Sequence, residues 1–164
     1  MTKTQKDLMD AFAGESQANR RYLAFAKKAE AEGYKQIAKL FRAAAEAETV
    51  HAHNHLREAG EIKGTKENLE AAVSGETFEF QYMYPAMIED AKAEALEGAK
   101  RSFVYANEVE KIHAELYKKA LADIGNNPDV DYYVCQVCGN TVEGEAPEEC
   151  PVCGAKKQVF KKVC

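Results

Sequence analysis

Residues 41–51, FRAAAEAETVH, and residues 103–113, FVYANEVEKIH, share one pattern that ends in an acid and a histidine three positions apart. On a helix, this spacing places the two side chains on one face, one turn apart. Two such faces turned toward each other bring together two carboxylates and two imidazoles, the ligand set of a metal pair in a bundle core. The pairs are Glu48 with His51 and Glu110 with His113.

A second pair of segments repeats in the same way, as LMDAFAGES at 8–16 and LEAAVSGET at 69–77. Each supplies one acid, Glu15 or Glu76, and the copies lie about 60 residues apart, as do the two longer segments. The repeat predicts one helix pair used twice. The second copy adds Glu79, one turn after Glu76 and on the same face.

The heptad stripes through these segments are apolar except where the acids and histidines lie. A lone Glu-x-x-His is usually solvated, and a lone acid on an apolar stripe more often forms a salt bridge between helices. These stripes carry no Lys or Arg, and a buried carboxylate is costly unless it is paired or bound to a cation. A dinuclear metal site is therefore favoured, with predicted ligands Glu15, Glu48, His51, Glu76, Glu79, Glu110 and His113.

The remaining histidines and the neighbouring acids lack this support. We expect His53 to lie on a solvent-exposed face of the helix. His55 continues the stripe of His51, and we expect it to be packed or solvated rather than to bind metal. Glu46 and Glu108 lie two residues before the ligand acids, so they point elsewhere on the helix and are expected to be surface charges.

Length, composition and net charge limit the class of protein to which the chain can belong. The chain has 164 residues, 46% of them hydrophobic, and a net charge of −5. These values suit one domain plus a small module and argue against a nucleic-acid partner. No apolar run approaches membrane-spanning length, and the first residues lack the apolar core of a signal peptide. We therefore expect a cytoplasmic protein without a membrane partner.

Leu, Ala, Glu and Lys dominate up to about residue 125, which predicts a mainly α fold. Gly33, Gly60 and Gly98 are read as breaks between helices, and Pro85 should kink the third helix or free a carbonyl. The predicted domains are residues 1–127 and 128–164. The expected helices run from about Thr4 to Ala31, Tyr34 to Ala59, Thr65 to Leu96, and Ala99 to Ile124.

Two Cys-x-x-Cys-Gly knuckles mark the C-terminal module. Four thiolates at this spacing form a tetrahedral site for one iron or one zinc. A redox-active metal pair needs a one-electron carrier beside it, which favours iron, although zinc can compete in overexpressed material. Cys164 is read as a free, exposed thiol without an assigned role. The four ligands are Cys135, Cys138, Cys150 and Cys153.

These motifs carry a family resemblance over nearly the whole chain. The ligand set, the two knuckles, and the strings AGESQA at 13–18 and MYP at 83–85 are similar to those of rubrerythrins. The resemblance implies a ferritin-like four-helix bundle with a non-haem di-iron centre, joined to a rubredoxin-like Fe(Cys)4 domain. It also implies a peroxidase of oxidative-stress defence, which reduces hydrogen peroxide to water. The electrons would come from NAD(P)H through a reductase or a rubredoxin and pass through the Fe(Cys)4 centre.

The resemblance also implies roles for single residues. Glu79 resembles an exchangeable ligand that replaces His51 on the first iron after oxidation, which agrees with the preference of ferric iron for carboxylate. Tyr22 and Tyr84 resemble tyrosines that hydrogen-bond the ligand carboxylates, although plain packing is equally open. By motif, Glu48 and Glu110 would bridge the irons, Glu15 and His51 would bind one iron, and Glu76 and His113 the other.

One feature departs from the ferritin-like pattern, in which the second and third helices run parallel. The crossover would have to climb ~34 Å at helical rise, but the six residues of the link reach only ~20 Å. Either the third helix doubles back, or the helix pairs of two subunits are exchanged. The internal repeat favours an exchanged homodimer, because exchange preserves the geometry of the site.

Two other functions compete with the peroxidase. A ferroxidase or iron-handling protein of the ferritin class would share the bundle but would not explain the cysteine module. A non-catalytic scaffold with a zinc ribbon would leave the buried polar residues of all four stripes without a purpose.

Overall fold

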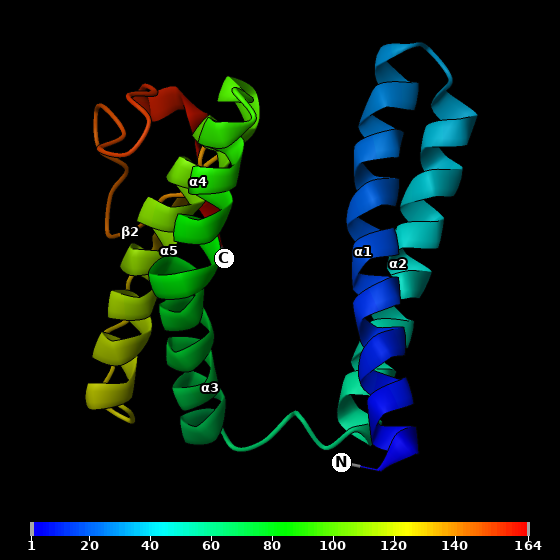
Figure 1. Ribbon diagram of the computed structural model, residues 1–164, viewed down its shortest axis with the longest axis horizontal. Helices are drawn as coiled ribbons and strands as arrows, with labels where there is room; N and C mark the ends of the chain where they lie inside the picture. The colour runs from blue at the N-terminus through cyan, green and yellow to red at the C-terminus, as the bar shows by residue number, and fades with distance from the viewer. Residues whose placement is uncertain (1, 164) are drawn as a thin grey trace. The chain divides into compact units, whose positions relative to one another are not determined.

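The computed structural model describes residues 2–163 and is mostly helical (Figure 1). Cys164 lies outside the described residues, so its role as a free thiol stays a prediction. The helices are α1 (Lys3–Ala31), α2 (Lys35–Glu58), α3 (Thr65–Phe78), the π-helical η1 (Glu79–Met83), α4 (Tyr84–Ala93) and α5 (Glu97–Ala122). The strands are β1 (Tyr132–Cys135), β2 (Thr141–Glu143) and β3 (Phe160–Val163), with a 3-10 turn η2 (Lys157–Val159) before β3.

The chain packs as two compact units, Met1–Lys63 and Gly64–Cys164. This division follows the internal repeat, since each unit contains one copy of the helix pair. The predicted boundary at 127/128 instead separates helices from strands, and it stays a prediction about domains.

The first unit is the hairpin of α1 and α2, closed by a seam of alanines. Small side chains let the two backbones approach closely, as the buried positions Ala26 and Ala38 illustrate. A polar clamp fixes the register of the pair, because the Asn19 amide donates to the Ala45 carbonyl at 2.7 Å and to Thr49 Oγ1 at 2.8 Å.

The second unit joins a helical hairpin to the C-terminal module. The rod formed by α3, η1 and α4 packs along α5, and a three-stranded antiparallel sheet of order β2-β1-β3 follows. Tyr133 in the central strand pairs with Val142 on one side and Lys162 on the other. Strand β2 contacts α5, so the module is attached to the helix that carries two of the predicted metal ligands.

The third helix continues through Pro85 with a change of hydrogen-bond pattern rather than a break. Proline has no N–H, so it leaves a carbonyl of the preceding turn without its helical partner. The chain takes up one wide turn, η1, in which the Tyr84 N–H reaches back to the carbonyl of Glu79. Such wide turns are frequent at functional sites, and this one begins at the predicted ligand Glu79.

The prediction that Gly98 separates the last two helices is wrong. Gly98 lies in the first turn of α5, and the chain turns instead around Ala95, which has a positive φ of 55°. The reason is local hydrogen bonding. The Leu96 N–H bonds the Ala91 carbonyl and the Ala95 N–H bonds the Lys92 carbonyl, which closes a Schellman motif without glycine.

The first helix pair closes with the same motif, but with glycine at the left-handed position. Gly33 has a φ of 87°, and the bonds from Tyr34 to Ala29 and from Gly33 to Glu30 match those around Ala95. The two loops are thus equivalent halves of the repeat. Only the second loop has a residue with a Cβ, Ala95, in the left-handed conformation, which a Cβ disfavours.

Substitution Ala95→Gly should stabilise the protein. Removing the Cβ relieves about 1–2 kcal/mol of strain in the left-handed conformation. Glycine also loses more conformational freedom on folding, which cancels part of this gain. We expect a net gain of about 1 kcal/mol in the free energy of unfolding, measured by urea denaturation. The matched variant Gly33→Ala should lose a similar amount, and equal stability of all three proteins would contradict the loop assignment.

Candidate metal centres

Three side chains of the first unit form a compact donor set. Glu15 comes from the middle of α1, and Glu48 and His51 come from one face of α2. One ligand atom of each lies within 4.8 Å of the other two, and His51 Nδ1 is 2.9 Å from Glu48 Oε2. The structure therefore brings together the three donors that the sequence predicted for this unit.

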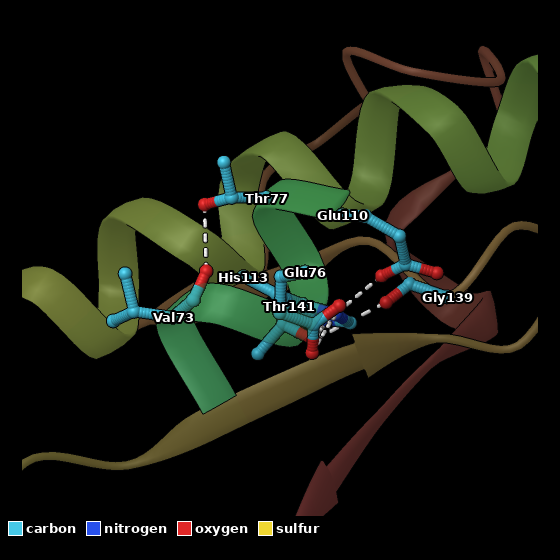
Figure 2. A network of polar contacts seen from close by, with 7 residues as sticks. All are labelled: Val73, Glu76, Thr77, Glu110, His113, Gly139 and Thr141. Carbon is cyan, nitrogen blue, oxygen red and sulfur yellow. Dashed lines mark hydrogen bonds and ion pairs between the residues drawn. The ribbon is translucent and has the colours of Figure 1, made fainter. Parts of the chain in front are cut away.

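The second unit contains the matching set of Glu76 from α3 with Glu110 and His113 from α5 (Figure 2). Their ligand atoms also lie within 4.8 Å of one another. His113 Nδ1 is 2.8 Å from Glu110 Oε2 and 3.8 Å from Glu76 Oε1. The imidazole thus turns its δ nitrogen toward both carboxylates, which is the arrangement expected of a metal ligand.

The pKa values of this set reflect its clustered acids. Burial and the neighbouring Glu110 carboxylate raise the pKa of Glu76 to about 7. The hydrogen bond to Glu110 raises the pKa of His113 above its usual value. Both shifts follow from acids gathered in a partly buried place, where a bound cation would be stabilised. Mixed carboxylate and imidazole donors suit a divalent first-row metal such as iron.

The predicted ligand Glu79 lies close to this set but outside it. Burial and the charge of Glu110 raise its pKa, and the charge of His113 lowers it in part. Its position at the first residue of η1 is separated from Glu76 by less than one turn. The exchangeable role expected for Glu79 stays a prediction.

The two predicted tyrosines have different surroundings. Tyr22 lies in an aromatic cluster with Phe25 and Phe41, with ring centroids 6.4 and 6.1 Å away. For Tyr84, burial and the carboxylates of the second unit raise the pKa, so its ring lies within their electrostatic reach. A hydrogen bond from either hydroxyl to a ligand stays a prediction.

The histidines and acids that were not predicted to bind metal lie at exposed or half-buried positions, as expected. His53 is exposed and His55 is half-buried. Glu46 is exposed, and Glu108 pairs with Lys111 at 2.6 Å on the surface of α5.

The four predicted cysteines form a third donor set. Cys135 and Cys150 are buried, and the sulfur pairs Cys135–Cys153 and Cys138–Cys150 are 3.7 and 3.6 Å apart. A tetrahedron with metal–sulfur bonds of about 2.3 Å has edges of about 3.8 Å, so one ion fits at the centre.

The surroundings favour thiolate at Cys150, whereas burial raises the pKa of Cys138 and of Cys153. Burial alone would raise the pKa of Cys150, but backbone N–H groups of Val152 and Cys153 lower it to about 7. Asn140, which is almost fully buried, directs its amide toward Cys150 Sγ at 3.6 Å. Hydrogen bonds to sulfur stabilise the ligand charge and help to set the potential of an iron–sulfur centre.

Sequence reasoning missed Asn140 and its neighbour Thr141. His113 Nε2 lies 2.9 Å from Thr141 Oγ1, which links a predicted ligand of the metal pair to the cysteine module. The only available signal was that both residues follow the first knuckle directly.

Comparison with known proteins identifies the family. Residues 6–121 match the family model described as Rubrerythrin, and residues 133–161 match that of the rubrerythrin rubredoxin-like domain. The chain belongs to the rubrerythrin family. Rubrerythrin-2 of Clostridium acetobutylicum is 40% identical over 171 residues, covering 94% of this chain and 93% of the relative. Nigerythrin of Nitratidesulfovibrio vulgaris is 36% identical, covering 96% and 85%.

A solved structure described as fully reduced, all-ferrous nigerythrin aligns with a TM-score of 0.61 and 34% identity. The alignment covers 99% of this chain and 88% of the nigerythrin chain. The ferritin-like helical fold with a rubredoxin-like domain is thereby confirmed. The predicted metal complement of a di-iron centre and one iron at the cysteines is confirmed as well.

Membership of the rubrerythrin family also confirms the general class, an iron-dependent oxidoreductase of the peroxidase type. The described residues include no helix with both the length and the apolarity needed to cross a bilayer. A cytoplasmic location stays a prediction.

Metal removal should make the stability of the helices depend on pH. The raised pKa of Glu76 means that the folded apoprotein holds a proton that the unfolded chain loses above about 4.5. This contribution to stability is complete below pH 4.5 and is lost as the pH rises through about 7. The raised pKa of His113 acts in the same direction.

We therefore expect the helical melting temperature of metal-free protein to fall between pH 5 and 8, measured by circular dichroism. The variant Glu76→Gln should flatten this dependence, whereas Glu108→Gln, on the wet face of α5, should leave it unchanged. An unaltered slope in the Glu76 variant would show that this carboxyl does not carry the titration.

Proposed function

We propose that this protein reduces hydrogen peroxide to water, with electrons that originate from NAD(P)H and reach it through a redox partner. One observation supports the proposal above others. A cysteine module suited to one-electron transfer lies directly against the helix that carries Glu110 and His113. A ferroxidase of the ferritin class has no need of this attachment.

The complete di-iron centre needs both donor sets, and we propose that they come from two chains. Only residues 59–64 separate α2 from α3, which is too short for the crossover of a ferritin-like bundle. The face that carries the donors of the first unit also leaves large apolar side chains exposed to solvent. Phe25 and Ile37, on the stripes of Glu15 and Glu48, are 47% and 48% exposed. An exchanged homodimer would cover these faces and pair the two sets.

When two ferrous ions are bound, they supply the two electrons that, with two protons, convert hydrogen peroxide into two molecules of water. The protein's part is to hold and cover the site. Glu15, Glu48 and His51 from one set and Glu76, Glu110 and His113 from the other would hold the pair, with Glu48 and Glu110 shared between the ions. Glu79 would exchange with His51 as a ligand. The carboxylates fully offset the charge of two ferrous ions and hold the pair in place.

The cysteines would return the electrons. Cys135, Cys138, Cys150 and Cys153 hold an iron that cycles by one electron, so two transfers restore the site after each peroxide. The external donor would be an NAD(P)H-dependent reductase or a rubredoxin that docks on the exposed side of the module.

Substitution Cys138→Ala should separate the two halves of the reaction. Coupled NADH oxidation should fall to background, because no electron reaches the metal pair. One rapid oxidation of the pre-reduced di-iron site by peroxide should remain, measured by stopped-flow absorbance. Wild-type protein with zinc at the cysteines, in which the module keeps its fold, should behave in the same way. Loss of the single oxidation while both irons are still bound would contradict this division of labour.

Mixing two defective variants tests the exchanged dimer. Glu48→Ala damages the first unit and Glu110→Ala the second. In an exchanged heterodimer, one centre receives both defects and the other receives none. Half of the centres in a heterodimer, or about a quarter of those in a randomly associated mixture, should therefore regain iron and activity. Without exchange every centre keeps one defect, and mixing restores nothing.

The mixture should be unfolded and refolded together, and its iron content and peroxide reduction measured. A mixture of Glu46→Ala with Glu108→Ala controls for effects of refolding. Iron content at the level of the separate variants would exclude a centre shared between chains.

A further inference from the structure

A continuous bridge joins a ligand of the metal pair to the cysteine module within one unit (Figure 2). His113 Nε2 is 2.9 Å from Thr141 Oγ1, and Thr141 Oγ1 is 3.2 Å from the carbonyl of Gly139. Gly139 is covalently bonded to Cys138. Two hydrogen bonds and one peptide link therefore connect His113 with a cysteine ligand.

The directions of these two bonds determine the tautomer of His113. Thr141 has one hydroxyl proton, and the carbonyl of Gly139 can only accept it. The threonine oxygen is then free to accept from His113 Nε2–H. When a metal ion replaces the proton that Nδ1 shares with Glu110, the neutral imidazole keeps its proton on Nε2 and offers its Nδ1 lone pair, on the side of Glu110 and Glu76, to the ion.

The bridge lies between two further contacts of the module with α5, which hold it in place. A Cβ added to Gly139 would lie 3.7 Å from the buried side chain of Val109, so the knuckle rests closely on the helix. Farther along, Lys119 forms an ion pair with Glu143. Strand β2 thus follows α5 in the same direction, with Thr141 between its two anchors.

We propose that Thr141 is a positioning residue that fixes the His113 tautomer and provides the route for electrons from the cysteine-bound iron to the metal pair that His113 of the same chain helps to bind. Each transfer oxidises the cysteine-bound ferrous iron to ferric and reduces one ferric ion of the pair to ferrous. The electron route rests on the proposed function, whereas the tautomer does not.

Two substitutions of Thr141 separate the hydroxyl from the shape of the side chain. Thr141→Val keeps the branched shape in β2 but removes the hydroxyl, and Thr141→Ser keeps the hydroxyl. Thr77→Val is the matched control. Its hydroxyl bonds the Val73 carbonyl at 2.6 Å within α3 and does not form part of the bridge (Figure 2).

The first measurement is independent of turnover. In zinc-loaded protein, imidazole ¹⁵N shifts should report the Nε2–H tautomer of His113 in wild type, Thr141→Ser and Thr77→Val, and should change in Thr141→Val. The affinity of the dinuclear site should fall about 10- to 100-fold in Thr141→Val alone, the usual effect of losing a partner that orients a ligand. An unchanged tautomer and affinity in Thr141→Val would overturn the positioning role.

The second measurement follows electrons in iron-loaded protein after one oxidation by peroxide. The first oxidation should proceed at the wild-type rate in every variant. Transfer from the cysteine-bound iron should slow at least about 10-fold in Thr141→Val and recover in Thr141→Ser. Equal transfer rates in all variants would overturn the electron route. A wild-type protein that fails to reduce peroxide would instead refute the proposed function, while the tautomer result would stand.

Discussion

The structure depends on gathering negative charge at partly buried positions, which are half-buried throughout the second set and include the exposed His51 in the first. Each unit brings together two carboxylates and one imidazole from two helices, and the heptad stripes that carry them are otherwise apolar in sequence, without Lys or Arg. The shifted pKa values of Glu76 and His113 express the resulting cost in the metal-free protein. Iron removes this cost, so binding of metal and burial of the two faces are expected to occur together.

Much of this arrangement could be predicted because it follows from local rules. The spacing of Glu48 and His51 requires only helical geometry, and so does that of Glu110 and His113. The spacing of the cysteines alone predicts the two metal-binding knuckles. The bounds of α1 and α2 agree with prediction within one residue, because helix propensity and Gly33 act over short distances.

What could not be predicted depends on contacts distant in sequence or on competition between local rules. At Ala95, hydrogen bonds at the end of the helix outweigh the preference for glycine, so the break falls before Gly98. At Pro85, the sequence predicts a kink or a freed carbonyl, and the structure shows the wide turn η1 directly before it. The bond from His113 to Thr141 spans 28 positions, and no periodicity in the chain refers to it.

The attachment of β2 to α5 makes the stability of the two kinds of centre interdependent. A module of this size has little apolar interior, so it relies on its own ion to stay ordered. Without that ion, the support that Thr141 in β2 gives to the outer nitrogen of His113 would weaken. The metal in the cysteine module would therefore also help to keep a ligand of the metal pair in position.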